Sequence, residues 1–300
     1  MPQGVPRELL GTAKLPRLIV LSLGDWSAIA IVWFVALHTP AWLYPVWLVL
    51  IAGRFHALGV LLHDAAHTPR ARRTFQLRFL EILAGYPVGT SLDAMRYHHL
   101  RHHRDLGLAG DPYLKEWVGN SRVRFWVMSL RYFLLVPLWV LRGFYGAIAT
   151  YVPALRNGYG RLFLQDRSAD DLTNSAEVIA CAREDRWQSL FYLCFAALVT
   201  VRPRWSLEFY VLPLVIAGYF AGYRLLVEHK QEVSQTDGVE SILRLTRNHH
   251  LGLLGKLFFA PHNVGYHLVH HLHPQVALEH LPSLQRWYES SVNLPAQNAG

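Results

Sequence analysis

The chain has 300 residues, of which 52% are hydrophobic and only 17% are charged. Soluble globular chains carry about 25% charged residues, so this composition excludes a disordered chain and argues against two soluble domains. The formal net charge of +8 permits a nucleic-acid partner, but the basic residues flank long apolar runs and form no nucleic-acid-binding motif. We therefore expect one membrane domain over residues 1–300 and no nucleic-acid partner.

The first two apolar runs predict a helical hairpin. Residues 18–37 are interrupted only by Asp25, and a bilayer core of about 30 Å needs about 20 helical residues. A cleaved signal peptide is the alternative, but its apolar region is typically about 7–15 residues long, and no small-residue cleavage site follows Leu37. After a short turn, residues 41–62 begin with the aromatic residues that favour a membrane interface and predict a second span.

Two further apolar segments lie in the middle of the chain. Residues 79–88 are too short to cross a membrane. Residues 125–152 contain Arg131 and Arg142, which are three helical turns apart and therefore on one predicted face, with Pro137 between them. This pattern predicts an amphipathic helix at the membrane surface rather than a crossing helix.

The second predicted hairpin consists of residues 187–201 and 207–227, although the first of these runs is short for a span. Of the 29 lysines and arginines, 25 lie outside the four spans and their outer turns, on one side of the membrane. The positive-inside rule makes that side cytoplasmic. We expect an all-α protein with four transmembrane helices in two hairpins, interfacial helices, and cytoplasmic termini. A cytoplasmic cap then comprises residues 63–186 and 228–300.

Histidine clusters follow the predicted spans. His63 and His67 come after the second span, and the pattern H-x-x-H-H occurs twice later in the chain. Residues three or four positions apart share a helix face, so each cluster directs its imidazoles to one side. An even number of crossings brings all the clusters to the same side of the membrane. The remaining candidates are His99, His102, His103, His229, His267, His270 and His271.

Clustered imidazoles predict a metal site, because neutral imidazole binds iron, zinc, copper and nickel. The chain has two cysteines, too few for a cysteine-ligated zinc or iron–sulfur site. Nine imidazoles are too many for one ion, whereas two ions with four or five each would leave positions for oxygen or water. Asp64, Glu228 and Asn263 stand beside the clusters, and we expect them to hydrogen-bond the distal ring nitrogens and fix the histidine tautomers.

The histidine clusters and span spacing resemble those of the membrane fatty acid desaturase superfamily over residues 41–284. The segment from Asn263 to Pro274 follows the pattern N-x-x-Y-H-x-x-H-H-x-x-P and is especially similar to acyl-lipid and sphingolipid desaturases. The resemblance implies a two-iron centre held by the nine histidines. It also implies O2-dependent desaturation or hydroxylation of an unactivated C–H position in a lipid acyl chain.

The same resemblance implies partners. The substrate would enter from the bilayer. The sequence contains no His-Pro-Gly-Gly motif of a fused cytochrome b5, so we expect electrons from a separate ferredoxin, rubredoxin or cytochrome b5 type donor.

Several alternatives remain open at this stage. A carotenoid hydroxylase or ketolase, or an alkane hydroxylase, would carry the same clusters, because they determine the oxidant and not the substrate. A histidine-rich metal transporter or metal-binding membrane protein is the alternative of another class, but transporter sites usually lie near the bilayer midplane. Asp25 and Arg54 within the spans could pair with each other, contact headgroups or bind substrate. No role follows from the sequence for His98, His249, His250 and His262.

Overall fold

The computed structural model describes residues 4–69, 74–249 and 252–291. Every named element in this part of the chain is a helix, and the only β-pairings there are two isolated bridges, Thr12 with Val276 and His229 with Thr246. The predicted all-α fold is confirmed.

The first two long helices, α1 (Leu15–Leu37) and α2 (Tyr44–Ala66), pack against each other, with a 3-10 turn at Ala41–Leu43 between them. Their apolar sequences contain few polar side chains that need a hydrogen-bond partner. Within α1, Ser22 and Ser27 donate their hydroxyls to backbone carbonyls four residues earlier, at 2.8 Å in each case. Large apolar side chains point outward, including Phe34, which is 65% exposed. Such outward apolar surface is typical of lipid-facing helices.

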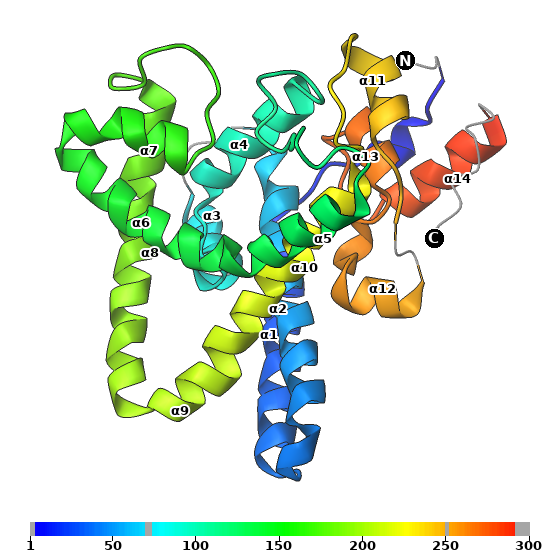
Figure 1. The fold of residues 1–300 in the computed structure, drawn as a ribbon. Helices are drawn as coiled ribbons and strands as arrows, with labels where there is room; N and C mark the ends of the chain where they lie inside the picture. The colour runs from blue at the N-terminus through cyan, green and yellow to red at the C-terminus, as the bar shows by residue number, and fades with distance from the viewer. Residues whose placement is uncertain (1–3, 70–73, 250–251, 292–300) are drawn as a thin grey trace.

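The second helix pair has a different shape. The helix α8 (Ala176–Val201) is joined through α9 (Pro203–Ser206) and a π-helical turn (Leu207–Val211) to α10 (Leu212–Glu228). Figure 1 shows α8 and α10 diverging from this turn, and both pairs extending in the same direction, away from α4, α11 and α13. Since they diverge, α8 packs on α6 (Leu135–Tyr151) and α10 packs on α2.

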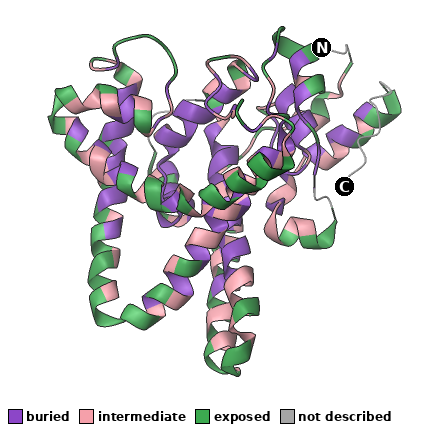
Figure 2. Cartoon of the chain, in the orientation of Figure 1, coloured by how far each residue is buried: buried purple, intermediate pink, exposed green. Residues whose placement is uncertain are grey.

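Four helices are long and apolar enough to cross a membrane by length and composition. Three coincide with predicted spans: Leu15–Leu37, Ala41–Ala66 and Pro203–Glu228. The fourth is Arg122–Tyr151, which we expected at the membrane surface. The predicted span 187–201 is not among the four; it forms the apolar end of α8, and the other half of that helix is charged. Figure 2 shows exposed residues along the outer sides of α8 and of the α1–α2 pair.

The segment Arg122–Tyr151 is divided into α5 (Arg122–Arg131), a 3-10 turn (Tyr132–Leu134) and α6, which run across the molecule in Figure 1. The expectation that Arg131 and Arg142 share one face is wrong. The 3-10 turn between them changes the helical phase, so Arg131 is exposed while Arg142 is fully buried. Arg142 instead forms an ion pair of 3.2 Å with the buried carboxylate of Asp185 on α8.

Shorter helices surround the ends of α2 and α10 and form the cap in which the histidines lie. At the start of the first of them, the Thr74 hydroxyl caps the helix by accepting the Leu77 N–H at 3.2 Å. They are α3 (Phe75–Leu80), the turns Glu81–Gly85 and Tyr86–Val88, α4 (Leu92–Arg104), α7 (Arg156–Leu162), α11 (Gly238–Leu245), α12 (Leu253–Phe258), α13 (His267–Leu272) and α14 (Leu281–Ser291), with 3-10 turns at Arg7–Leu9, Pro153–Leu155 and Pro261–Asn263.

The ionisable residues within the first helix pair contact each other. Arg54 donates to Asp25 at 3.1 Å, and His262 lies 2.8 Å from the other carboxylate oxygen of Asp25. Arg54 also donates to the carbonyl of Leu257 at the end of α12. Of the roles left open for Asp25 and Arg54, the structure shows that they pair with each other. These contacts connect α1, α2 and the α12 region.

Candidate metal centre

Four segments bring the nine predicted histidines together. The end of α2 supplies His63 and His67, α4 supplies three, His229 follows α10 directly, and α13 supplies the last three. In α4 and α13 the histidines are spaced by three and four residues, so they leave each helix on one face. Residues more than 200 positions apart therefore converge in one buried cluster.

Eight of these histidines form two groups of four. Within each group, the candidate ligand nitrogens lie within 4.8 Å of one another. One group is His63, His67, His99 and His270; the other is His102, His229, His267 and His271.

The ninth, His103, joins the two groups. Its Nε2 lies 3.0 Å from Nε2 of His99 in the first group. Its ring centroid lies 4.2 Å from that of His271 in the second group. The arrangement is thus two adjacent sets of imidazoles with one ring between them.

The hydrogen bonds of the distal ring nitrogens test whether a cation fits the second group. His229 Nδ1 donates to the Leu225 carbonyl at 3.0 Å, and His102 Nδ1 donates to the Asp111 carboxylate at 2.8 Å. With one proton on each ring, held at Nδ1, both Nε2 atoms present lone pairs, yet they lie 2.9 Å apart. Nε2 of His267, also 2.9 Å from Nε2 of His229, adds a third ring. A cation among these nitrogens satisfies an arrangement that hydrogen bonds alone cannot satisfy.

Burial keeps the imidazoles in the form that binds metal. Burial lowers the pKa of His67 and of His229 to about 3. Burial is also the largest cause of the lowered pKa in five further histidines outside α2, and neighbouring histidines lower the pKa further. The pKa lies well below its usual value in His99, His103, His267, His270 and His271. Neutral rings are the ligand form, so the group is prepared for a cation before one binds.

Asp111 is a functional residue that the sequence analysis missed. Besides contacting His102, its carboxylate accepts the backbone N–H groups of Gly107 at 3.0 Å and Tyr113 at 2.8 Å. Burial raises its pKa, but His102 and these N–H groups outweigh that effect and lower the pKa to about 2. The available signal was an aspartate at the end of the glycine-containing turn just after the second cluster.

The three predicted supporting residues lie in different places. Glu228 Oε1 lies 3.5 Å from Nδ1 of both His267 and His249. Asp64 and Asn263 line a separate cavity, together with His262. Their role in orienting the histidine rings remains a prediction.

The histidines without a predicted role are now located, except His250, which lies outside the described residues. His98 Nδ1 is 2.7 Å from the Tyr113 hydroxyl, His249 is buried beside Glu228, and His262 pairs with Asp25.

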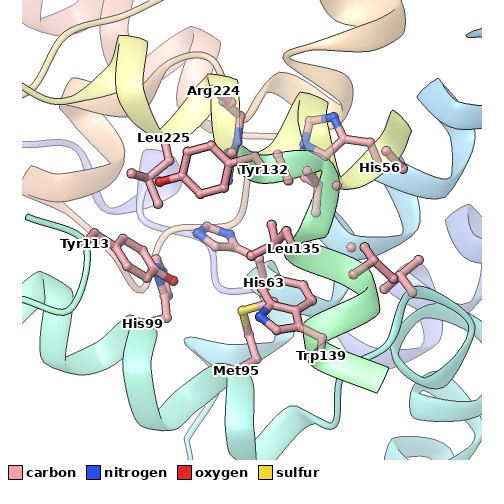
Figure 3. Close-up of a pocket in the computed structure, with 18 of the residues that line it drawn as sticks. His56, His63, Met95, His99, Tyr113, Tyr132, Leu135, Trp139, Arg224 and Leu225 are labelled. Carbon is pink, nitrogen blue, oxygen red and sulfur yellow. The ribbon is translucent and has the colours of Figure 1, made fainter. Parts of the chain in front are cut away.

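A mostly apolar cavity reaches the histidine cluster. Its volume of about 120 Å³ is roughly ten times the space that one water molecule needs. His63, His99, His102, His229 and His267 are among the residues that line the cavity. Figure 3 shows Met95, Leu135 and Trp139 on its walls beside His63. The other apolar residues that line it include Phe55, Val88, Val136, Leu214 and Ala217.

Comparison with known proteins agrees with this geometry. The family model described as fatty acid desaturase matches residues 39–299. The chain is also 27% identical over 258 residues to a protein of Bradyrhizobium elkanii named dihydrorhizobitoxine desaturase. The aligned region covers 84% of this chain and 69% of that protein.

Proposed function

Because this chain belongs to the fatty acid desaturase family, we propose that its nine clustered histidines hold two iron ions and that it oxidises an unactivated C–H position of a lipid acyl chain with O2. Family membership makes the protein an oxidoreductase of the desaturase type, and its long apolar helices make it an integral membrane protein. The metal, the substrate and the O2 chemistry belong to the proposal.

We place the membrane crossings at α1, α2, the apolar end of α8, and α10. The support is that both helix pairs extend in the same direction, away from the histidine cluster, while α5 and α6 run across them (Figure 1). The apolar end of α8 also exposes large apolar side chains, among them Val201, which is 71% exposed. The bias of lysine and arginine supports a cytoplasmic location for both termini and the histidines.

The residues of this chain have three tasks in the proposed reaction. The histidines hold the ions as neutral rings, and Asp111 keeps the proton of His102 on Nδ1 so that Nε2 remains a ligand. The apolar cavity aligns the substrate and excludes water from the histidines that line it. When bound, two irons would supply the reaction with O2 that removes hydrogen from an unactivated carbon. Electrons come from a separate ferredoxin, rubredoxin or cytochrome b5 type carrier.

One observation carries this proposal: members of both groups of four imidazoles line the same mostly apolar cavity. Purified protein should contain about two irons per chain. His102→Ala and His270→Ala should lose iron and activity, measured by metal analysis and by mass spectrometry of lipids from cells expressing each form. His38→Ala is the matched control, because this exposed histidine lies at the far end of α1. Full activity and unchanged metal content in both cluster variants would refute the proposal.

A further inference from the structure

The cavity wall carries polar groups that the metal centre does not use. Besides the proposed metal ligands and Glu228, four of the residues lining it have buried atoms without a hydrogen-bond partner among the described residues. Leaving such an atom unsatisfied costs about 1–3 kcal/mol. These atoms are Nε2 of His56, Nε2 of His98, the hydroxyl of Tyr132, and Nε and Nη1 of Arg224.

Three of these groups lie on one part of the wall. Figure 3 shows Arg224, Tyr132 and His56 together, on the opposite side of the cavity from Met95 and Trp139. Tyr132 is held there by close packing: a Cβ atom on Gly222 of α10 would lie 1.9 Å from Cγ of its ring. The position of this hydroxyl is therefore set by the backbone contact between α10 and the turn before α6.

The donors in this group are Arg224 and Tyr132. His56 Nδ1 lies 2.7 Å from the carbonyl of Phe258, which can only accept, so Nδ1 carries the hydrogen and Nε2 of the neutral ring is an acceptor. Arg224 is charged and contacts Glu228 at 3.3 Å through Nη1, in a geometry that leaves Nε and Nη1 without a hydrogen bond. Guanidinium and phenol groups together suit an oxygen acceptor.

We propose that Arg224 and Tyr132 bind a carbonyl or carboxylate oxygen of the substrate inside the cavity, and that this contact determines which substrates are oxidised. The inference rests on the proposed function. It deepens that function by naming the substrate class, an apolar molecule whose oxygen-bearing end is buried near the metal centre.

The same contacts limit which carbon can react. Arg224 Nη1 is 3.3 Å from Glu228 Oε1, which is itself 3.5 Å from Nδ1 of His267. The guanidinium is thus within about 7 Å of a proposed ligand ring, about the length of five carbon–carbon bonds. A substrate whose oxygen contacts Arg224 brings carbons a few bonds from that oxygen to the histidine cluster.

Binding of three probes of equal chain length tests the proposal: octanoate, methyl octanoate and octane. Calorimetry is performed on the full-length, iron-loaded protein in lipid nanodiscs, with empty nanodiscs subtracted. We expect at least one of the oxygen-bearing probes to bind ten times more tightly than octane. A preference for octanoate identifies a carboxylate, and equal binding of the ester identifies a neutral carbonyl; both outcomes support the proposal. Octane binding as tightly as both other probes would overturn it.

Two variants test whether Tyr132 and Arg224 cause the preference for oxygen-bearing probes. Tyr132→Phe keeps the ring against Gly222 and removes only the hydroxyl, and Arg224→Met removes the guanidinium. Each should reduce the preference about tenfold and leave octane binding unchanged. Tyr219→Phe is the matched control, since Tyr219 lies on α10 but does not line the cavity. If Arg224→Met fails to fold, Tyr132→Phe decides, and an unchanged preference in that variant overturns the proposal.

The iron content of each variant separates this inference from the proposed function. Loss of preference with iron retained supports the oxygen-binding wall. A wild-type protein that binds no iron contradicts the proposed function instead, whatever its preference among the probes.

Discussion

His102 and Asp111 form a buried contact in which Nδ1 of the imidazole donates to the carboxylate at 2.8 Å. Both side chains are almost fully buried, and the carboxylate is also held by two backbone N–H groups. The pair therefore fixes both the orientation and the tautomer of a ring in the second group of imidazoles. Carboxylate–histidine–metal arrangements of this kind raise the basicity of the ligand nitrogen.

The Asp111→Asn substitution should weaken metal binding by about 10- to 100-fold, because the amide loses the charge that holds the His102 proton on Nδ1. Titration of metal-free protein with Fe²⁺ or Zn²⁺ measures the change. Asp105→Asn in the same turn is the control, since Asp105 pairs with exposed Arg104. Equal metal affinity of Asp111→Asn and wild type would show that the contact does not support the metal site.

Replacement of Asp185 by Asn should destabilise the protein by about 3–5 kcal/mol, because it removes the carboxylate that neutralises the charge of fully buried Arg142. The exposed pair of Arg204 and Glu208 provides the comparison, and Glu208→Gln should change stability by about 1 kcal/mol or less. Unfolding in detergent, followed by circular dichroism, measures both. Similar effects at the two sites would contradict a structural role for the buried pair.

Gly222→Ala should lower stability by about 1–3 kcal/mol, because the added methyl group collides with the Tyr132 ring and must displace the turn before α6. The shift should also weaken binding in the adjacent cavity. Gly24→Ala in α1 is the matched control, since nothing lies within 4 Å of its new Cβ. Thermal unfolding of the two variants should separate them, and equal midpoints would contradict the close packing.

Stability of the metal-free protein should fall as pH decreases below about 6.5. Burial lowers the pKa of His67 and of His229 to about 3 in the folded chain, whereas exposed histidine in the unfolded chain titrates near 6.5. Between these values the unfolded state binds more protons, so acid favours unfolding, while from pH 7 to pH 8 these groups contribute no change. Denaturant unfolding at pH 5, 6, 7 and 8 tests the sign. Constant stability from pH 7 to pH 5 would mean that the rings are not buried as described.

The local features of this protein follow from its sequence. Apolar runs predict as spans three of the four helices that are long and apolar enough to cross a membrane, and the three- and four-residue spacing of His99, His102 and His103 places them on one helix face. These inferences succeed because helical periodicity and the length of an apolar run depend only on neighbouring residues. Local sequence also indicates that the imidazoles belong to a metal site.

Only the tertiary structure decides which distant groups meet. It places Asp111 against His102, turns Arg142 inward to Asp185, pairs Arg54 with Asp25, and aligns Arg224 and Tyr132 on one cavity wall. Each of these contacts depends on how helices cross and where a short turn changes helical phase, neither of which leaves a periodic signal in the sequence. The sequence therefore determines which chemistry the chain can carry, and packing determines which charges are neutralised and which polar groups remain free to bind a substrate.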